Sequence, residues 1–426
     1  LLASSAASDV YKRQVKKEED IMKKFNKFLS VAVASAMVMA MAGCGNTDNG
    51  SAATGTNAAT ESAAASDSAA SGSVFKIGGI GPTTGGAAVY GLAVQHGAEI
   101  AVEEINAAGG INGYQVEFKF QDDEADAEKS VNAYNALKDW GAQIIDGSTT
   151  SGACIAVTDK TKEDNMFQIT PSGSAVECVQ YDNNFRVCFS NPNQGLASAQ
   201  YIGENGLAEK IAVIYDSSDV YSSGIYEKFA KEAENQPFEI VAAEAFTADN
   251  KTDFSVQLQK AKDAGADMVF LPIYYQESAL ILTQAAAMGY APKWFSCDGM
   301  DGILGGVDNF DVSLTEGVML LTPFAADATD DLTQSFVTKY KEKYGETPNQ
   351  FAADSYDAIY VIKAAIEKSG VTPDMSVSDI CDGMKAAMTE ITVDGLTGSG
   401  MTWTADGEAN KAPKAVVIEN GAYKAM

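Results

Sequence analysis

The chain has 426 residues, enough for two domains, and 46% of them are hydrophobic, so it can bury large cores. Its formal net charge of −28 argues against nucleic acids and anionic membrane surfaces as electrostatic partners. A single histidine, His96, leaves almost nothing for zinc sites or Ser-His-Asp chemistry, so we expect no metal, no cofactor and no enzymatic activity.

The first part of the chain has the layout of a secretory signal peptide. Residues 1–21 contain no methionine, and we interpret them as translated flanking DNA that takes no part in the fold. From Met22, lysines precede an apolar segment, 28–42, that is too short to span a bilayer. Residues 22–43 end in Met-Ala-Gly before Cys44, which resembles the lipobox of bacterial lipoproteins. The resemblance implies that Cys44 is lipidated; the alternative is a buried core helix with a stray thiol.

Residues 44–73 hold almost no large apolar side chain. A tract rich in Ser, Ala, Thr and Gly cannot bury enough surface to offset the entropy of ordering, so we predict a flexible tether. Coil scaling gives it an average reach of roughly 30 Å. An Ala-rich helix is the alternative. Together, the lipid and the tether predict a soluble body anchored on the outer face of a membrane.

From residue 74 onward, strand-like and helix-like segments alternate. The first half has predicted strands at 74–82, 114–124, 142–149 and 166–172, with predicted helices at 90–110, 126–141 and 153–165. The second half has predicted strands at 210–218, 238–246, 266–275 and 293–299, with helices at 222–235, 254–265 and 276–289. Two such series predict an α/β fold with two doubly wound lobes, each a parallel sheet covered by helices.

Ligands of open α/β sheets bind beyond the carboxyl ends of the strands, at helix N-termini. Four loops at such places are rich in Ser, Thr and Gly: 81–91, 147–153, 170–175 and 216–224. Their exposed N–H groups and hydroxyls suit a small polar ligand, particularly a carboxylate. Residues 274–277 and 297–301 add aromatic and acidic groups at two further strand ends.

The segments "INAAGGINGYQVE" and "ITPSGSA" resemble the type I periplasmic binding proteins of the leucine/isoleucine/valine-binding kind, which serve ABC transporters, and the likeness spans 75–423. It implies two lobes joined by a hinge of three crossings, near Asn193, Thr322 and Lys411. Lobe 1 would comprise 74–193 and 323–411. Lobe 2 would comprise 194–322 and 412–426.

The resemblance also implies a site for the backbone of a free amino acid. Ser151 would bind the carboxylate, Ser172 and Ser174 would accept from the ammonium, and Asp298 would pair with the ammonium from the second lobe. The aromatic positions that wall the pocket would be Tyr90, Tyr221 and Tyr274. Taken singly, each serine could instead be a helix N-cap, and Tyr274 or Tyr275 could be core. We expect only one of these two tyrosines to face the cleft, because side chains alternate along a strand.

The sequence departs from the family in several places. The disulfide that joins the loop near Asp126 to the loop before Ser151 in familiar members has no cysteines here, and the acid at Asp298 is one methylene shorter than the usual Glu. Glycines of the branched-chain binders are replaced by Pro272 and Ile273, which leaves the pocket size open.

Two local patterns have competing interpretations. The acidic run of Asp122, Asp123, Glu124 and Asp126 could bind calcium, but we favour a solvated helix N-terminus, where the helix dipole stabilises acids. Cys178 and Cys188 could form a disulfide or remain free buried thiols.

We therefore predict an extracytoplasmic, lipid-anchored and monomeric binding protein that delivers a free amino acid, branched-chain or similar, to ABC permease subunits. Two alternatives stay open for a binding protein: a small amide-like solute as the ligand, or a role as the ligand sensor of a membrane receptor. An enzyme is disfavoured because the chain has no Gly-x-Ser-x-Gly elbow and no evident Cys-His pair.

Overall fold

The computed structural model describes residues 72–426. The predicted signal peptide, Cys44 and almost all of the predicted tether lie outside these residues. Within the described range, no helix is both long enough and apolar enough to cross a membrane.

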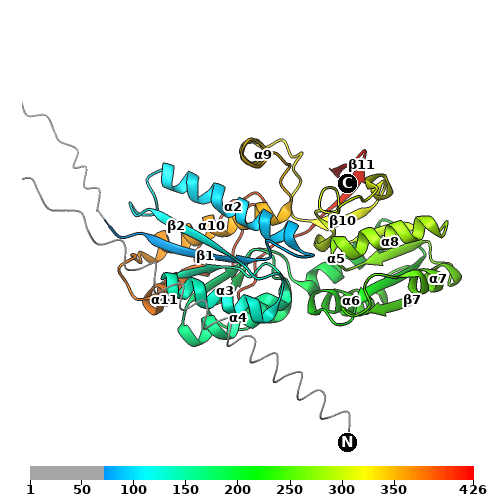
Figure 1. Ribbon diagram of the computed structural model, residues 1–426, viewed down its shortest axis with the longest axis horizontal. Coiled ribbons are helices and arrows are strands. Elements are labelled where there is room, and N and C mark those ends of the chain that lie inside the picture. The colour runs from blue at the N-terminus through cyan, green and yellow to red at the C-terminus, as the bar shows by residue number, and fades with distance from the viewer. Residues whose placement is uncertain (1–71) are drawn as a thin grey trace, which may run out of the picture. The chain divides into compact units, whose positions relative to one another are not determined.

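The first sheet has five strands, all parallel, in the order β2-β1-β3-β4-β5 (Figure 1). β1, β3 and β4 are almost entirely buried, as expected of strands covered on both faces. The sheet's strands are β1 (Phe75–Gly81), β2 (Val116–Asp122), β3 (Ile144–Asp146), β4 (Phe167–Thr170) and β5 (Asn184–Arg186).

The second sheet has seven strands in the order β12-β11-β10-β9-β8-β6-β7. Its strands are β6 (Lys210–Asp216), β7 (Glu239–Phe246), β8 (Met268–Leu271), β9 (Lys293–Ser296), β10 (Met319–Thr322), β11 (Lys414–Glu419) and β12 (Ala422–Ala425). β11 and β12 pair antiparallel, so the expectation of a wholly parallel second sheet is corrected at this edge. The chain returns to this sheet after residue 411, where β11 runs antiparallel to β10 and forms a hairpin with β12 that is closed by Asn420 and Gly421, both at positive φ.

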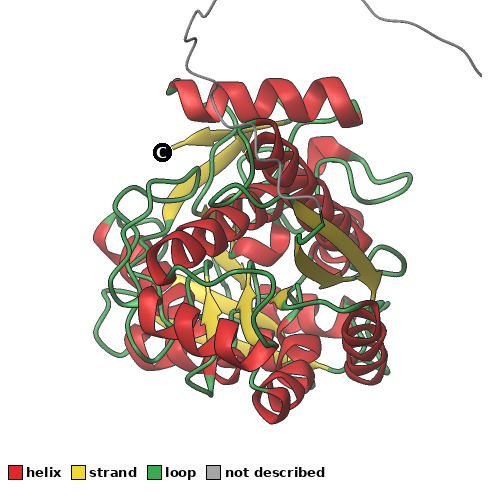
Figure 2. Cartoon of the chain, turned by 90° about the vertical axis from the view of Figure 1, so that its left-hand side faces the viewer, coloured by secondary structure: helices red, strands yellow, loops and turns green. Residues whose placement is uncertain are grey.

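Helices lie on both sides of the strands (Figures 1 and 2). They are α2 (Ala88–Ala107), α3 (Ala127–Trp140), α4 (Ser151–Asp164), α5 (Asn191–Glu204), α6 (Val220–Ala233), α7 (Ser255–Asp263), α8 (Tyr275–Ala287), α9 (Asp331–Tyr344), α10 (Gln350–Ser369) and α11 (Val377–Met388). The described residues also form short 3-10 helices at η1 (Val176–Val179), η2 (Asp298–Met300) and η3 (Val312–Thr315).

Helices α2 and α10 pack closely although they are far apart in sequence. At Gly97 a Cβ atom would lie 2.0 Å from the carbonyl oxygen of Ala352, so only glycine allows this approach. α10 starts where Asn349 accepts a hydrogen bond from the Ala352 N–H, and it ends at Gly370 in the left-handed region, φ 70°. The packing of α2 on α10 brings the last third of the chain onto the first sheet's helices.

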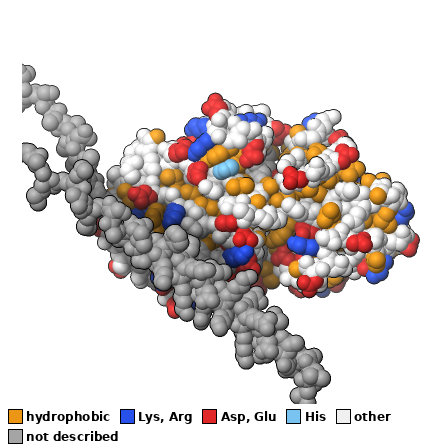
Figure 3. Space-filling view, viewed as in Figure 1, with side chains coloured by type: hydrophobic (Ala, Val, Ile, Leu, Met, Phe, Trp, Pro, Cys, Tyr) orange, Lys and Arg blue, Asp and Glu red, His pale blue; other side chains and the backbone are white. Residues whose placement is uncertain are grey.

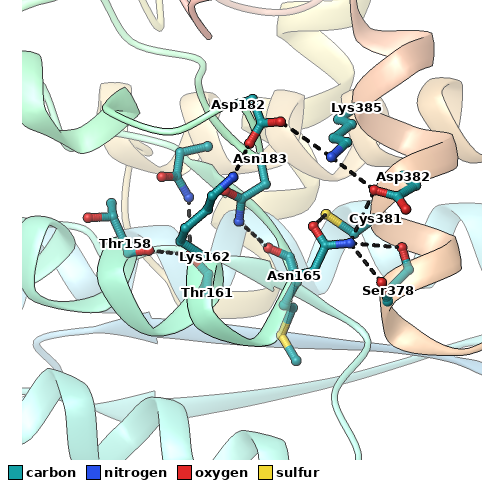
Figure 4. Close-up of polar contacts among 12 residues, drawn as sticks. Thr158, Thr161, Lys162, Asn165, Asp182, Asn183, Ser378, Cys381, Asp382 and Lys385 are labelled. Atoms are coloured by element: carbon teal, nitrogen blue, oxygen red, sulfur yellow. Dashed lines mark hydrogen bonds and ion pairs between the residues drawn. The ribbon is translucent and has the colours of Figure 1, made fainter.

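The end of α4 is held to α11 by polar contacts (Figure 4). Asn165 ends α4 in the left-handed region, and its amide donates to the hydroxyl of Ser378, 213 residues later, at 2.8 Å. Lys162 and Lys385 both pair with Asp182, at 2.6 and 3.3 Å. α11 is therefore fixed to the same layer as α4, whose other end carries the candidate site.

Two local predictions are corrected by the structure. The strand predicted at 266–275 ends at Leu271, and Tyr275 already belongs to α8, with Tyr274 as its N-cap residue. Pro272 has no N–H to donate to a sheet, which favours the end of the strand there. The acidic run is not wholly solvated: Asp126 caps α3 as expected, but Asp123 is fully buried.

Candidate functional site

Three of the predicted serines lie where strands of the first sheet end and α4 begins. The Ser151 hydroxyl oxygen accepts from the N–H groups of Ser174 and Ala175, at 3.2 and 3.1 Å. Its own proton therefore remains available to a ligand. The Ser172 hydroxyl donates to the carbonyl of Thr149 at 2.6 Å. These contacts join the two serine loops into one polar surface.

The N-terminus of α4 has no side-chain cap, because the hydroxyl of its N-cap residue Thr150 makes no hydrogen bond. The Ser174 hydroxyl is also buried and has no hydrogen-bond partner within residues 72–426. A buried hydroxyl without a partner costs free energy unless something else supplies the hydrogen bond. Open helix N–H groups and free hydroxyls together suit a carboxylate.

The serine loop after β4 is held from beneath by Arg186. This guanidinium is fully buried and donates to the carbonyls of Gly173 and Ala175, at 3.2 and 2.9 Å. Its Nε lies 3.2 Å from the Glu408 carboxylate. The backbone on both sides of Ser174 is thus fixed by a charged group from β5.

Aromatic rings form the wall of the site. The Tyr90 ring lies 4.3 Å from that of Phe351, and Tyr221 and Tyr274 stack at 4.9 Å, all between ring centroids. The Tyr90 hydroxyl donates to the carbonyl of Gly299, which comes from the second sheet's strand ends. Groups from both sheets therefore meet at this wall.

Tyr274 lines the cavity, whereas Tyr275 is buried in the core, with its ring centroid 5.1 Å from that of Tyr90. The expectation that one tyrosine faces the site is confirmed. The reason given for this expectation was wrong, because Tyr274 and Tyr275 lie at the start of α8 and not in a strand.

Asp298 opens η2 directly after β9, and its carboxylate is held by two donors. The Tyr221 hydroxyl donates to one oxygen at 2.6 Å and the Gln194 amide to the other at 2.9 Å. Burial raises the pKa of Asp298 to about 7, and the nearby Asp354 carboxylate adds to the rise. No basic side chain within residues 72–426 forms an ion pair with Asp298. The carboxylate is thus suited to an incoming cation.

One cavity brings together six of the seven predicted site residues. Ser174 is the exception, and it contacts the cavity's Ser151 through its N–H. The free volume is about 10 Å³, the room of about one water molecule, so a ligand must displace wall side chains or separate the two walls. The lining residues are Tyr90, Thr149, Thr150, Ser151, Ser172, Tyr221, Tyr274, Asp298, Gly299 and Phe351.

Five residues of the site were missed from the sequence: Gln194, which holds Asp298, and Thr149, Thr150, Gly299 and Phe351 of the cavity lining. Thr150 precedes Ser151 in a loop already singled out, so its N-cap position was a usable signal. Gln194 and Phe351 carry no such signal. Gln194 is 104 residues from Asp298, and Phe351 follows a loop without a motif.

The remaining candidates lie elsewhere. His96 stacks on Tyr344 at 3.6 Å and is visible as the pale-blue surface patch in Figure 3; burial lowers its pKa. Cys178 and Cys188 are buried and unbridged, so of the two interpretations the free thiols are confirmed. Among residues 72–426, no group of three or more His, Cys, Asp or Glu side chains is arranged to hold a metal ion.

Residues 74–422 match the family described as periplasmic binding protein. The chain is 30% identical over 300 residues to Leu/Ile/Val-binding protein homolog 3 of Brucella melitensis. The aligned region covers 70% of this chain and 80% of that relative. The chain is also 30% identical over 302 residues to the leucine-, isoleucine-, valine-, threonine-, and alanine-binding protein of Pseudomonas aeruginosa. The aligned region covers 69% of this chain and 78% of that relative. Among solved structures, it is similar to the branched-chain amino acid transporter substrate binding protein LivJ from Streptococcus pneumoniae in complex with isoleucine. That similarity has a TM-score of 0.75 at 29% identity and covers 83% of this chain and 98% of LivJ.

Proposed function

The chain belongs to the periplasmic binding protein family, and from this we propose that it binds a free amino acid, branched-chain or similar, as the binding subunit of an ABC importer. The predicted family and fold class are confirmed. Since the family and the relatives are binding proteins, the chain is a solute-binding protein and not an enzyme. The ligands named for the relatives support an amino acid here.

One observation carries the choice of ligand. Asp298, a buried carboxylate with no counter-cation in the described part of the chain, lines the same small cavity as Ser151 at the uncapped start of α4. An α-amino acid has an ammonium and a carboxylate on one carbon, so one small molecule would supply both missing charges. The ammonium would displace part of the hydrogen bonding to Asp298, and the carboxylate would accept from Ser151, Thr150 and the helix N–H groups.

The experiment is a thermal-shift screen of the protein against free amino acids. A ligand that binds only the folded state raises the melting temperature, by RT ln(1 + [L]/Kd) in stability. We expect at least one amino acid with an apolar side chain to raise it, and the matching amide and amine, which each lack the carboxylate charge, to have little effect. A screen in which no free amino acid shifts the melting temperature would overturn the proposal.

We further propose that the protein is a monomer, anchored by a lipid on Cys44, that delivers its ligand to ABC permease subunits. Cys44 lies outside the described residues, so the support is the lipobox-like Met-Ala-Gly-Cys sequence and the lysine-rich start before it. Two acyl chains on one cysteine are enough to keep a protein on the membrane, because each methylene buried in the bilayer adds ~0.8 kcal/mol of binding free energy.

Cys44→Ser should release the protein from the membrane fraction into the soluble fraction. The serine keeps the size of the side chain but removes the thiol that would be acylated. Fractionation with mass spectrometry measures the result, and Cys381→Ser, at a buried free thiol, is the control that should remain in the membrane fraction. A Cys44→Ser protein that still sediments with membranes and keeps its lipid mass would place the anchor elsewhere.

Ligand binding should strengthen as the pH rises from about 5 to about 7. Unbound Asp298 has its pKa raised to about 7, and a bound ammonium would lower it, so binding below pH 7 must release a proton. The affinity should therefore rise by up to about tenfold per pH unit below pH 7 and level off above it. Calorimetry in two buffers of different ionisation enthalpy measures the released proton, and Asp298→Asn should abolish the release. A pH-independent affinity would contradict this role.

A further inference from the structure

A second and larger cavity of about 530 Å³ lies where the crossing after β10 passes α2 and α9. Figure 3 shows the surface hollowed between α9 and the part of the chain around β11. Most of its wall is apolar, and three of its four charged residues, Asp327, Lys341 and Glu346, are exposed at the rim. The apolar wall consists of Val89, Leu92, Ala93, Leu304, Phe324, Ala326, Tyr340 and Pro348.

Asp301 is the buried charged residue of this cavity. Its side chain is 4% exposed, and one carboxylate oxygen accepts from the Gln350 N–H at 2.9 Å. The other oxygen has no hydrogen-bond partner among the residues that the structure describes. Burial raises the pKa of Asp301, and the hydrogen bond from the Gln350 N–H and the nearby Tyr423 hydroxyl oppose the rise only in part. No basic side chain within residues 72–426 forms an ion pair with this carboxylate.

We propose that this cavity is a second binding site, for a small organic ammonium with an apolar body whose nitrogen pairs with Asp301. The apolar wall and the size of the cavity suit such a body, since small-molecule sites are mostly apolar with a few polar groups that fix orientation. The rings of Phe324 and Tyr340 add surfaces that favour a cation. An anion would meet an unpaired carboxylate, and a neutral apolar molecule would leave it unpaired.

The second site is connected to the first through one turn. Asp298 opens η2 and Asp301 directly follows it, and the Asp301 N–H donates to the Asp298 carbonyl at 2.9 Å. Gln350 contacts both, since its N–H donates to Asp301 and its amide donates to the Asp298 carbonyl at 2.9 Å. A cation on Asp301 reduces the negative potential at Asp298, so a bound amine should weaken the binding of an amino-acid ammonium to Asp298. By linkage, a bound amino acid should weaken the binding of the amine to Asp301 by the same factor. This coupling rests on the proposed function, whereas the amine site does not.

The test is calorimetry of the full-length protein with 2-phenylethylammonium, without amino acid. We expect saturable one-to-one binding, and at least tenfold weaker binding of the neutral analogue 2-phenylethanol. Asp301→Asn keeps an oxygen for the Gln350 N–H and should weaken the amine at least tenfold. Asp308→Asn, an exposed acid seven residues later, makes the same charge change and should bind the amine like the wild type.

A second pair of variants leaves Asp301 and its hydrogen bonds untouched. Leu92→Arg adds a cation at the cavity wall and should block the amine, while Leu332→Arg, at a leucine of similar exposure outside the cavity, should not. Equal binding of amine and alcohol, or Asp301→Asn binding within threefold of wild type, would overturn the site. Failure of all amino acids in the thermal screen would overturn the proposed function and leave this result unchanged.

Discussion

Replacing Asp298 by asparagine should weaken amino-acid binding by roughly thirtyfold or more. The carboxylate is buried and held by Tyr221 and Gln194, so a bound ammonium would be paired in a desolvated place. Truncating one partner of such a pair commonly costs ~2–5 kcal/mol, and 1.4 kcal/mol is a factor of ten. Calorimetry with the amino acid found in the thermal screen measures the loss.

Ser151→Ala is the companion variant, and its affinity for the amino acid should fall by about tenfold or less. One hydroxyl is removed, while the N–H groups at the start of α4 remain for the carboxylate. The competing interpretation makes Asp298 only a turn former before Gly299, in which case asparagine would substitute almost freely. An Asp298→Asn affinity within threefold of wild type would support that interpretation and remove Asp298 from the site.

Lys411→Met should destabilise the folded protein by about 3–5 kcal/mol, because it breaks a buried ion pair from one side. The Lys411 ammonium lies 2.6 Å from the Asp354 carboxylate, and the two side chains are 1% and 3% exposed. Burial raises the pKa of Asp354 to about 6 even beside this lysine. Without Lys411, the carboxylate would be left in the interior with no cation, and urea unfolding measures the lost stability.

The double variant Asp354→Asn with Lys411→Met distinguishes two causes of the lost stability: loss of the attraction between the two charges, and the cost of a buried carboxylate left without a cation. If the unpaired Asp354 carboxylate causes the loss, the double variant should recover much of it, since neither charge of this ion pair remains. Lys411 lowers the pKa of Asp354, so in the single Lys411→Met protein that pKa should lie above about 6, and the protein should gain stability as the pH falls through this higher value and Asp354 takes up a proton. Equal stabilities of the single and double variants would contradict this explanation.

The sequence was a good guide where structure depends on neighbours along the chain. The predicted strand and helix segments correspond to β1–β4 and β6–β9 with their helices, because periodicity and caps are local signals. The residue pattern placed the start of α4 at 153, two residues after the helix begins, and the position of Ser151 at the helix start was implied by the family resemblance. The end of β8 was not predicted, since an apolar run such as residues 268–275 has no period that tells a buried strand from a helix start.

The sequence by itself determined the alternation of strands and helices, and with it which loops lie at strand ends and hold the serines. Only the tertiary structure decided what those loops face. Asp298 meets Gln194 and Tyr221 across 104 and 77 residues, and Phe351 reaches the cavity from α10. The chirality and pairing of parallel strands determine the sheet edge at which the loops lie. Side-chain contacts between residues this far apart in sequence also depend on how the helices pack, and no short stretch of sequence encodes that packing.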